Sequence, residues 1–148
     1  MIWKTKKFNQ LDTNTLYSIL KLRSEVFVLE QKCAYLDIDE KDKKAIHIFS
    51  LDKINSCIAY GRIFKPSDYY KNYTAITRIV IRKKDRKKKL GYKLVKKLIE
   101  TCLEKFPKKR IKISAQKYLQ KFYEKSGFVF KGENYLEDGI PHCAMYYS

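Results

Sequence analysis

Glycine and proline, which interrupt regular structure, are scarce in this sequence. Glycine occurs five times and proline three times in 148 residues, and no stretch is rich in both. Linkers between domains are usually rich in such residues, so their scarcity argues against a boundary within the chain. A chain of this length can bury one substantial core but not two. We therefore expect residues 1–148 to form a single globular domain.

Long apolar runs are missing as well. No run approaches the roughly 18 apolar residues that a membrane-spanning helix needs. The first ten residues, MIWKTKKFNQ, lack the apolar segment of a secretory signal peptide. These absences argue against the helical membrane and secreted classes, and we expect a cytoplasmic protein without a membrane partner.

Paired cysteines are also absent. Cys33, Cys57, Cys102 and Cys143 lie far apart, and none forms a CxxC pair. Such pairs are typical of zinc sites and of redox motifs. Each cysteine stands beside apolar residues, which favours buried free thiols in a reducing compartment. The sequence thus predicts no metal site.

Acidic residues are few. The chain has 33 lysines and arginines against 16 aspartates and glutamates, a formal net charge of +17 at pH 7. Such a charge attracts nucleic acids, anionic membranes and phosphorylated ligands without choosing among them. Because lysines are spread from Lys4 to Lys131, a general compositional bias accounts for most of the charge. One local cluster needs its own explanation, since seven of the eight residues from Arg82 to Lys89 are basic.

Local patterns predict strands and helices in an irregular order. Apolar residues at helical spacing follow Asp12 or Thr13, either of which can cap a helix that continues after a break to about Glu30. A second helix starts at Leu90, and a short third one ends before Gly127, which takes a left-handed conformation. β-Branched and aromatic runs predict strands at residues 2–8, 46–52, 57–64, 75–82, 110–115, 128–135 and 142–147.

The basic cluster lies between a predicted strand and a predicted helix. The backbone N–H groups at the start of such a helix have no partner within it and can bind a phosphate. Arg86 and the lysines after it add positive charge, and Gly91 in the first helical turn lets a pyrophosphate approach the backbone. The loop is neither a Walker GxxxxGK(S/T) sequence nor a Rossmann GxGxxG sequence. The spacing by itself leaves a nucleic-acid patch and a phosphate site both open.

Four stretches, ITRIVIR, RKKKLG, IKISAQ and FYEKSGF, occur in the order seen in the GNAT superfamily of acyl-CoA-dependent N-acetyltransferases, which the chain resembles. The loop is similar to the pyrophosphate motif of that superfamily, Q/R-x-x-G-x-G/A. Arg86 stands first and Gly91 last, whereas Lys89 replaces the middle glycine. The stretches LRSEVFVLEQKCAYLDIDEKD, ISAQKYLQKFYEKSGF and EDGIPH further resemble the ElaA-like branch.

The resemblance implies a GNAT fold of the α/β (α+β) class. In this fold a mixed, mostly antiparallel sheet of six to seven strands splits into a V and has about four flanking helices. The resemblance also implies direct transfer of an acetyl group from acetyl-CoA to the amine of an unidentified small molecule or peptide, in a ternary complex and without a metal. It implies no nucleic-acid partner, and it leaves a homodimer open. Two alternatives are a basic nucleic-acid- or ribosome-binding module and a GNAT fold that binds acyl-CoA without catalysis.

The same resemblance places acetyl-CoA along the strand before the loop and on the loop itself. The backbone of Ile79, Val80 and Ile81 is expected to pair with the pantetheine arm, with the amide near Val80 facing the thioester oxygen. The pyrophosphate is expected on the loop and the first helical turn, which comprise Arg86, Lys87, Lys88, Lys89, Leu90, Gly91 and Tyr92.

Two residues are candidates for moving protons. Tyr123 in FYEKSGF matches the tyrosine that often protonates the leaving thiolate in the superfamily, although its spacing alone favours an ordinary half-buried aromatic. His142, at the start of the last strand, is the candidate general base, because histidine titrates near neutral pH. The alternative for His142 is a histidine that is hydrogen-bonded at a strand end. His47 begins a strand that faces the core, and we expect it to be structural.

Acidic residues are candidates for the acceptor side of the site. Asp37 and Asp39 belong to a cluster in residues 37–42, and Glu137 and Asp138 form a second one. Carboxylates in these loops would attract a cationic amine, whereas loops exposed to solvent are the alternative. Glu30, at the end of the first helix, is expected on the same side as the two clusters.

Overall fold

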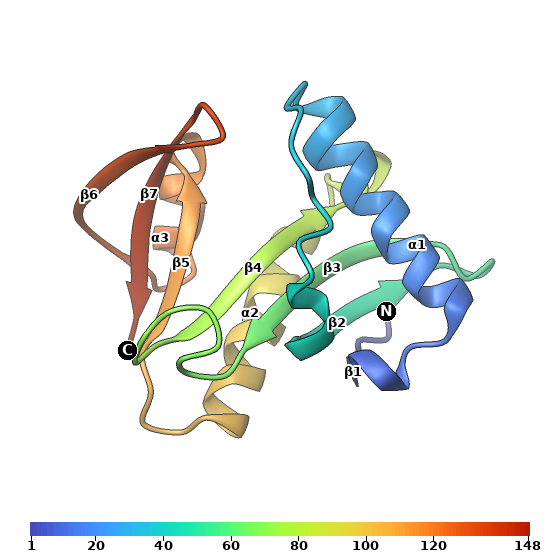
Figure 1. Cartoon of the computed structure of the whole chain (residues 1–148), viewed down its shortest axis with the longest axis horizontal. Helices are drawn as coiled ribbons and strands as arrows, with labels where there is room; N and C mark the ends of the chain where they lie inside the picture. Colours follow the sequence, from blue (N-terminus) through green and yellow to red (C-terminus); the bar gives the residue numbers. More distant parts are fainter.

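A single sheet of seven strands forms the centre of the structure (Figure 1). The structure is a computed structural model and describes residues 1–148. The strands follow the order β1-β2-β3-β4-β5-β7-β6, and all neighbours are antiparallel except β4 and β5. The strands are β1 (Lys4–Lys7), β2 (Ile46–Leu51), β3 (Cys57–Phe64), β4 (Thr74–Ile81), β5 (Ile111–Gln116), β6 (Val129–Glu137) and β7 (Ile140–Tyr147).

Helices cover both faces of the sheet, with α1 on one face and α2 and α3 on the other (Figure 1). They are α1 (Thr13–Arg23), α2 (Leu90–Lys105) and α3 (Gln120–Lys125). α1 continues as a π-helical segment, Ser24–Glu30, at the position where the sequence predicted a break. The expected count of about four helices is slightly high, since the π-helical segment extends α1 rather than forming a further α-helix.

Local side-chain chemistry accounts for where the helices start and end. The Asp12 carboxylate accepts the N–H of Thr15 at 2.7 Å and caps α1, as the sequence predicted. The apolar stripe of α2 is buried against the sheet. α3 ends where Gly127 has a φ of 102°, and the N–H of Phe128 returns to the carbonyl of Tyr123 at 3.1 Å.

β3 is buried along its whole length, because α1 packs on one of its faces and α2 on the other. Tyr60 faces α1 and packs in a cluster with Ile19. Gly61 faces α2, and a Cβ at this position would lie 2.7 Å from a methyl group of Leu98. β3 therefore has a continuous apolar run, which is typical of a strand covered on both faces.

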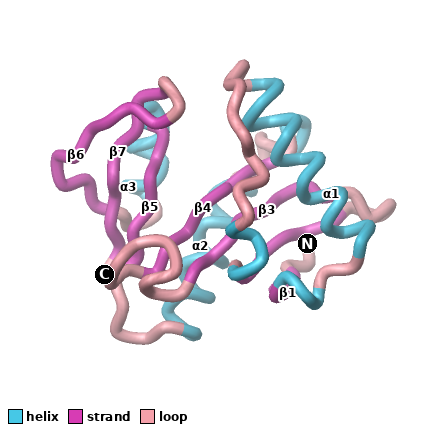
Figure 2. The backbone as a smooth tube through the Cα atoms, viewed as in Figure 1, coloured by secondary structure: helices cyan, strands magenta, loops and turns pink.

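β4 and β5 pair at one end only. Their parallel pairing consists of Thr74 with Ile111 and of Ala75 with Lys112, and the strands diverge beyond it (Figure 2). The β3–β4 register shifts where Arg78 takes a φ of 56°, and a bulge of this kind bends its strand. The split, mostly antiparallel sheet that the resemblance implied is confirmed by the structure.

Two predicted boundaries differ from the structure. The sequence predicted a turn over residues 136–141, whereas β6 and β7 leave only Asp138 and Gly139 between them, both with positive φ. The first strand is shorter than predicted, and Trp3 lies outside β1. The Trp3 side chain nevertheless packs against the hydrophobic core between the sheet and α2. None of the helices has the length and apolar character that a membrane crossing requires.

Candidate active site

A cavity of about 580 Å³ opens between β4 and β5, where the two strands separate. Small-molecule sites in proteins typically enclose roughly 300–1,000 Å³. The walls come from the π-helical segment, β4, the start of α2, β5, α3 and the β6–β7 turn. Residues from β4 and from the β5–β7 part of the sheet thus face the same cavity.

The loop before α2 contributes to this cavity. Lys89, with a φ of 54°, precedes the helix, and no side chain caps the helix N-terminus. The first backbone N–H groups of α2 therefore have no partner within the helix and can bind an anion. Lys87 and Lys88 are exposed and do not line the cavity, and Leu90 is buried in the core. The predicted loop residues that do line it are Arg86, Lys89, Gly91 and Tyr92.

Gly91 has a packing role that the sequence did not reveal. A Cβ at this position would lie 3.2 Å from the ring of Phe122, which belongs to α3. The same ring packs against Tyr92, with the two ring centroids 4.6 Å apart. Gly91 therefore lets α3 approach the first turn of α2, and all three residues line the cavity. The close approach of a pyrophosphate to Gly91 stays a prediction.

Arg86 links this loop to the π-helical segment. Its guanidinium donates two hydrogen bonds to the Glu30 carboxylate, at 2.7 and 3.0 Å, and its Nε donates to the Ile81 carbonyl at 3.0 Å. The hydrogen bonds from Arg86 lower the pKa of Glu30. Glu30 does line the cavity, but its charge is already paired and is not free to attract an acceptor amine.

Ile79, Val80 and Ile81 all line the cavity. The N–H of Arg82 donates to the carbonyl of Ile58 on β3 at 2.8 Å, and Val80 also pairs with β3. Because backbone groups alternate sides along a strand, Val80 directs its N–H to β3 and Ile81 directs its own away from β3. A donor for the thioester oxygen would therefore come from a neighbour of Val80 and not from Val80 itself.

Tyr123 lies in the wall that α3 contributes to the cavity. The residue is 6% exposed, and its ring packs edge-on against Phe122 and Phe128. Burial raises the pKa of the phenol, so that the hydroxyl keeps its proton at neutral pH. Tyr123 is therefore available as a hydrogen-bond donor to a group inside the cavity.

The β6–β7 hairpin and the adjoining β5 form a polar wall, here called the hairpin wall, which consists of Ser114, Glu137, Asp138, Ile140 and His142. His142 is 7% exposed, with Nδ1 2.7 Å from the Ile140 carbonyl and Nε2 3.4 Å from the Glu137 carboxylate. The Ser114 hydroxyl donates to the other oxygen of Glu137 at 3.2 Å. The structure thus brings the predicted base, His142, into contact with Glu137.

His47 belongs to the core and does not line the cavity. Its Nε2 is 2.9 Å from the Asp42 carbonyl and its Nδ1 is 2.6 Å from the Tyr60 hydroxyl. Because a carbonyl can only accept, Nε2 carries the hydrogen and Nδ1 accepts from Tyr60. Burial lowers the pKa of His47. The structural role expected for this histidine agrees with these contacts.

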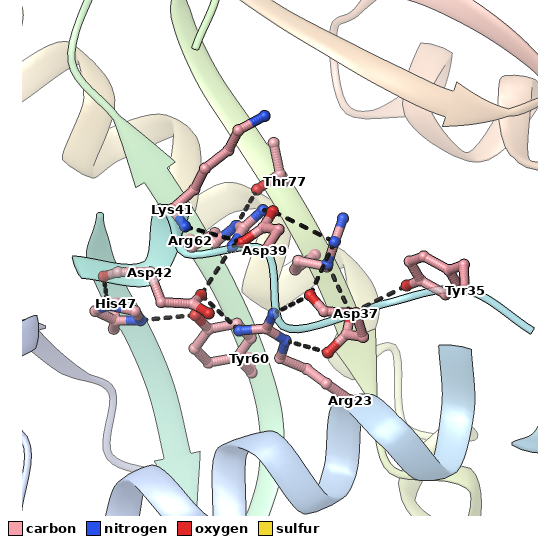
Figure 3. A network of polar contacts seen from close by, with 11 residues as sticks. Arg23, Tyr35, Asp37, Asp39, Lys41, Asp42, His47, Tyr60, Arg62 and Thr77 are labelled. Atoms are coloured by element: carbon pink, nitrogen blue, oxygen red, sulfur yellow. Dashed lines mark hydrogen bonds and ion pairs between the residues drawn. The ribbon is translucent and has the colours of Figure 1, made fainter. Parts of the chain in front are cut away.

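Three arginines and three aspartates form a closed network beside the cavity (Figure 3), consisting of Arg23, Arg62, Arg78, Asp37, Asp39 and Asp42. Arg23 donates to Asp37 at 2.9 Å and to Asp42 at 2.6 Å. Arg62 donates to Asp39 at 2.6 Å and to Asp42 at 2.8 Å. Arg78, at the bulge of β4, closes the ring through Asp37 at 2.8 Å and Asp39 at 3.5 Å.

The acceptor role expected for Asp37 and Asp39 is therefore corrected. Neither residue lines the cavity, and both carboxylates are held by arginines. Burial by itself would raise the pKa of Asp39, but the hydrogen bonds and charge of Arg62 outweigh it and lower that pKa. The two aspartates are also not solvated loop residues. They hold the segment after the π-helical segment against β3 and β4.

Two contacts across the cavity were not predicted from the sequence. Gln116 Nε2 donates to Gln31 Oε1 at 3.1 Å, and Cys33 Sγ donates to the Asp138 carbonyl at 3.7 Å. In each pair the partners are far apart in the chain, so no local pattern brings them together. These contacts join the residues that follow the π-helical segment to β5 and to the β6–β7 turn.

All four cysteines are free, and Cys57, Cys102 and Cys143 are buried, as predicted. Cys33 is only partly buried and lines the cavity, which the sequence did not predict. Burial raises the pKa of Cys57 and of Cys102 to about 12, so that both stay protonated thiols. No group of three or more histidine, cysteine, aspartate or glutamate side chains is placed to hold a metal ion.

Comparison with known proteins identifies the family to which this geometry belongs. The family model described as "Acetyltransferase (GNAT) domain" matches residues 15–148. The chain is 38% identical to the protein ElaA of Escherichia coli strain K12 over 144 residues, which are 97% of this chain and 94% of ElaA. The crystal structure of Escherichia coli ElaA has a TM-score of 0.92 at 35% identity and covers 100% of both chains. An acyl-CoA N-acyltransferase from Pseudomonas aeruginosa has a TM-score of 0.93 at 33% identity, again over 100% of both chains.

The split sheet and the loop before α2 thus define an acyl-CoA-dependent acyltransferase of the GNAT class, and the chain belongs to the GNAT acetyltransferase family. Within the family it is similar to ElaA along nearly its whole length. The resemblance seen in the sequence motifs is confirmed by both comparisons.

Proposed function

We propose that the chain transfers the acetyl group of acetyl-CoA to an acceptor amine, by direct attack in a ternary complex. One observation carries this proposal. The N-terminus of α2, the edge of β4, Tyr123 and the hairpin wall all face the same cavity. Both substrates can therefore meet there, and no covalent intermediate on the enzyme is needed.

Acetyl-CoA would be held mainly by backbone groups. The free N–H groups at the start of α2, with Arg86 and Lys89 beside them, suit the charge of a pyrophosphate. The edge of β4 that no longer pairs with β5 offers backbone donors and acceptors to the amides of a pantetheine arm. The exposed Lys87 and Lys88 would add long-range attraction for the phosphates.

The reaction has three chemical requirements. The acceptor must reach the thioester as a free amine, the carbonyl oxygen needs a donor as it becomes an oxyanion, and the thiolate needs a proton donor. In our proposal a backbone N–H at the edge of β4 serves the oxyanion and the hydroxyl of Tyr123 serves the thiolate. His142 serves the amine.

The proposal is tested by measuring CoA release from acetyl-CoA with polyamines, amino sugars, amino acids and peptides that have a free amine. We expect release with at least one class of amine, and a higher melting temperature in the presence of acetyl-CoA. No release together with no thermal shift would contradict the enzyme hypothesis. A thermal shift without release would favour a GNAT fold that binds acyl-CoA without catalysis, and salt-dependent binding of RNA without turnover would favour the nucleic-acid module.

The location and the assembly of the chain stay predictions. We expect it in the cytoplasm, either as a monomer or as a homodimer, and without a nucleic-acid partner. Sedimentation of the purified protein with and without acetyl-CoA would decide the oligomeric state.

A further inference from the structure

A cluster of polar side chains on the hairpin wall orients one carboxylate toward the cavity. The Tyr135 hydroxyl is 2.5 Å from the Ser114 hydroxyl, which in turn donates to one oxygen of Glu137 at 3.2 Å. The other oxygen of Glu137 lies 3.4 Å from Nε2 of His142. The Glu137 side chain is 48% exposed and lines the cavity. The carboxylate is thus held on one side and accessible on the other.

The tautomer of His142 follows from its neighbours. Nδ1 is 2.7 Å from the Ile140 carbonyl, which can only accept, so Nδ1 carries a hydrogen. In the neutral imidazole Nε2 then carries a lone pair, and the nearer carboxylate oxygen of Glu137 lies 3.4 Å from it. The N–H groups of an ammonium ion can donate to both of these acceptors. The pair is therefore suited to bind a hydrogen-bonding cation.

The charge around the pair also favours a cation. Glu137 and Asp138 both line the cavity. Arg78 lines it as well, but its Nε and Nη2 are bonded to Asp37 and Asp39 within a network of equal numbers of arginines and aspartates. The hairpin wall is thus an acidic site in a chain with a formal net charge of +17. An acceptor with a carboxylate beside its amine would bring like charges together there.

We propose that Glu137 binds the acceptor amine, that the Glu137–His142 pair takes its proton, and that the acceptor is an aliphatic ammonium ion without a carboxylate beside the amine. This inference rests on the proposed acetyltransferase function and names the acceptor class for it. Ser114 and Tyr135 are positioning residues, because they orient the carboxylate of Glu137.

The protons of the reaction balance in this arrangement. The ammonium ion gives one proton to Nε2 of His142 and becomes a neutral amine that is still bound to Glu137. The amine nitrogen attacks the thioester carbonyl, so that a C–N bond forms and the C–S bond breaks. A second proton passes from nitrogen to the thiolate by way of the Tyr123 hydroxyl, and one hydrogen stays on the amide nitrogen. His142 then returns its proton to solvent.

The first test compares two amines that differ by one carboxylate, 1,4-diaminobutane and ornithine, in CoA-release kinetics. We expect kcat/KM to be about 10-fold or more higher for 1,4-diaminobutane than for the α-amine of ornithine, because the carboxylate beside that amine and the hairpin wall repel. Mass spectrometry of the product identifies which nitrogen of ornithine is acetylated. Glu137→Gln should lower kcat/KM for 1,4-diaminobutane by about 100-fold, because the neutral amide no longer holds the ammonium ion beside His142, and should leave the Kd of acetyl-CoA unchanged. The matched control is Glu133→Gln, the same substitution on β6 outside the cavity, which should behave like the wild type.

The second test is independent of turnover and uses the two histidines of the chain. Adding 1,4-diaminobutane should shift the NMR signal of Nε2 of His142 in the wild type and not in the Glu137→Gln variant. His47 is buried with both ring nitrogens bonded inside the protein, so its signals serve as the internal reference. A cluster with a purely structural role would not make the His142 signal depend on the diamine.

Acetylation of the α-amine of ornithine as fast as or faster than that of 1,4-diaminobutane would overturn the proposed acceptor class, and a fully active Glu137→Gln variant would overturn the role of the carboxylate. If neither amine were acetylated while acetyl-CoA still bound, the inference would fail and the CoA site would stand. If acetyl-CoA itself did not bind, the proposed function would fail instead.

Discussion

Tyr123 and Asp37 are each 6% exposed, yet burial has opposite consequences for what they can bind. Tyr123 packs among aromatic rings and borders the cavity, so its hydroxyl is available to a ligand. Asp37 is packed between Arg23 and Arg78, and its carboxylate is already hydrogen-bonded. At the scale of single residues, the partners of a buried group decide whether it can take part in chemistry.

The role of Tyr123 can be tested at this scale. The substitution Tyr123→Phe removes only the hydroxyl, so we expect kcat to fall by about 100-fold, within the range for a lost acid or base. The Kd of acetyl-CoA, measured by calorimetry, should stay close to the wild-type value, because the aromatic packing is kept. Tyr17→Phe on the exposed face of α1 is the control. A variant that lost affinity and kept kcat would contradict the assignment of Tyr123 as the donor.

At the scale of elements, one ion pair connects the π-helical segment to the loop before α2. The Glu30–Arg86 pair joins the end of the π-helical segment to this loop, and both side chains are about one-third exposed. Glu30 offers Arg86 the same bidentate pairing that a phosphate group would offer. A pyrophosphate that binds to this loop, as we propose, would have to compete with Glu30 for the guanidinium.

We expect the substitution Glu30→Gln to remove this competition. The Kd of acetyl-CoA should fall by about 3- to 10-fold, because a partly exposed ion pair contributes on the order of 1 kcal/mol. Glu25→Gln, in the same segment, pairs only with Lys21 at the surface and should leave the Kd unchanged. If Glu30→Gln weakened binding instead, Glu30 would be needed to orient Arg86 toward the cosubstrate. The measurement is a calorimetric titration at low salt, where the pair is least screened.

At the scale of the whole molecule, a set of buried ionisable groups connects residues 37–42 to the sheet. Burial would raise the pKa of Asp42, but hydrogen bonds from Arg23 and Arg62 outweigh it and lower that pKa below 3.8. His47, which binds the Asp42 carbonyl, has its pKa lowered below 6.5 by burial. The folded protein therefore binds fewer protons than the unfolded chain in acid, and its stability depends on pH.

The lowered pKa values predict how the free energy of unfolding changes with pH. Below about pH 6.5 the unfolded chain protonates His47 and the folded protein does not, so the free energy of unfolding should fall as the pH is lowered. The slope from one such proton is at most about 1.4 kcal/mol per pH unit. Asp39 and Asp42 should add a second loss below about pH 4, where unfolded carboxylates take up protons. Urea unfolding at several pH values measures both parts.

The variant His47→Gln separates the two parts of the pH dependence. A glutamine side chain can hydrogen-bond but does not titrate. We expect the slope between about pH 6.5 and 5 to be smaller in this variant than in the wild type, while the loss below pH 4 remains. Equal slopes in the two proteins would show that His47 keeps an ordinary pKa in the folded state.

The elements of the fold could be predicted because their signals are local. The Asp12 cap, the apolar stripe of α2 and Gly127 after α3 each depend on residues within a few positions, and each prediction was confirmed. The predicted end of β6 was wrong, because the sequence LEDGIP, residues 136–141, was interpreted as a turn. Asp138 and Gly139 form a two-residue turn instead, which lets the pairing with β7 continue to Glu137.

The sequence predicted some residues of the candidate site but missed the contacts that others make. Tyr123 and Gly91 were found through motifs, although the contact of Gly91 with Phe122 depends on the packing of two helices. Asp37 and Asp39 were placed in the wrong role, since no local pattern shows that Arg23, Arg62 and Arg78 surround them. The pairing of Glu137 with His142 depends on the β6–β7 register and could not be read from either residue alone.

The sequence by itself determined the order of the elements, the basic loop at the start of α2 and the resemblance to a family, because these depend on periodicity and short motifs. Only the tertiary structure decided which charged side chains are available to substrates. Asp37 and Glu30 are paired with arginines that are distant in the chain, whereas Glu137 keeps one side open to the cavity. The physical reason is that a charged side chain can bind a ligand only if no neighbouring side chain already pairs with it. Folding brings such neighbours together from separate elements.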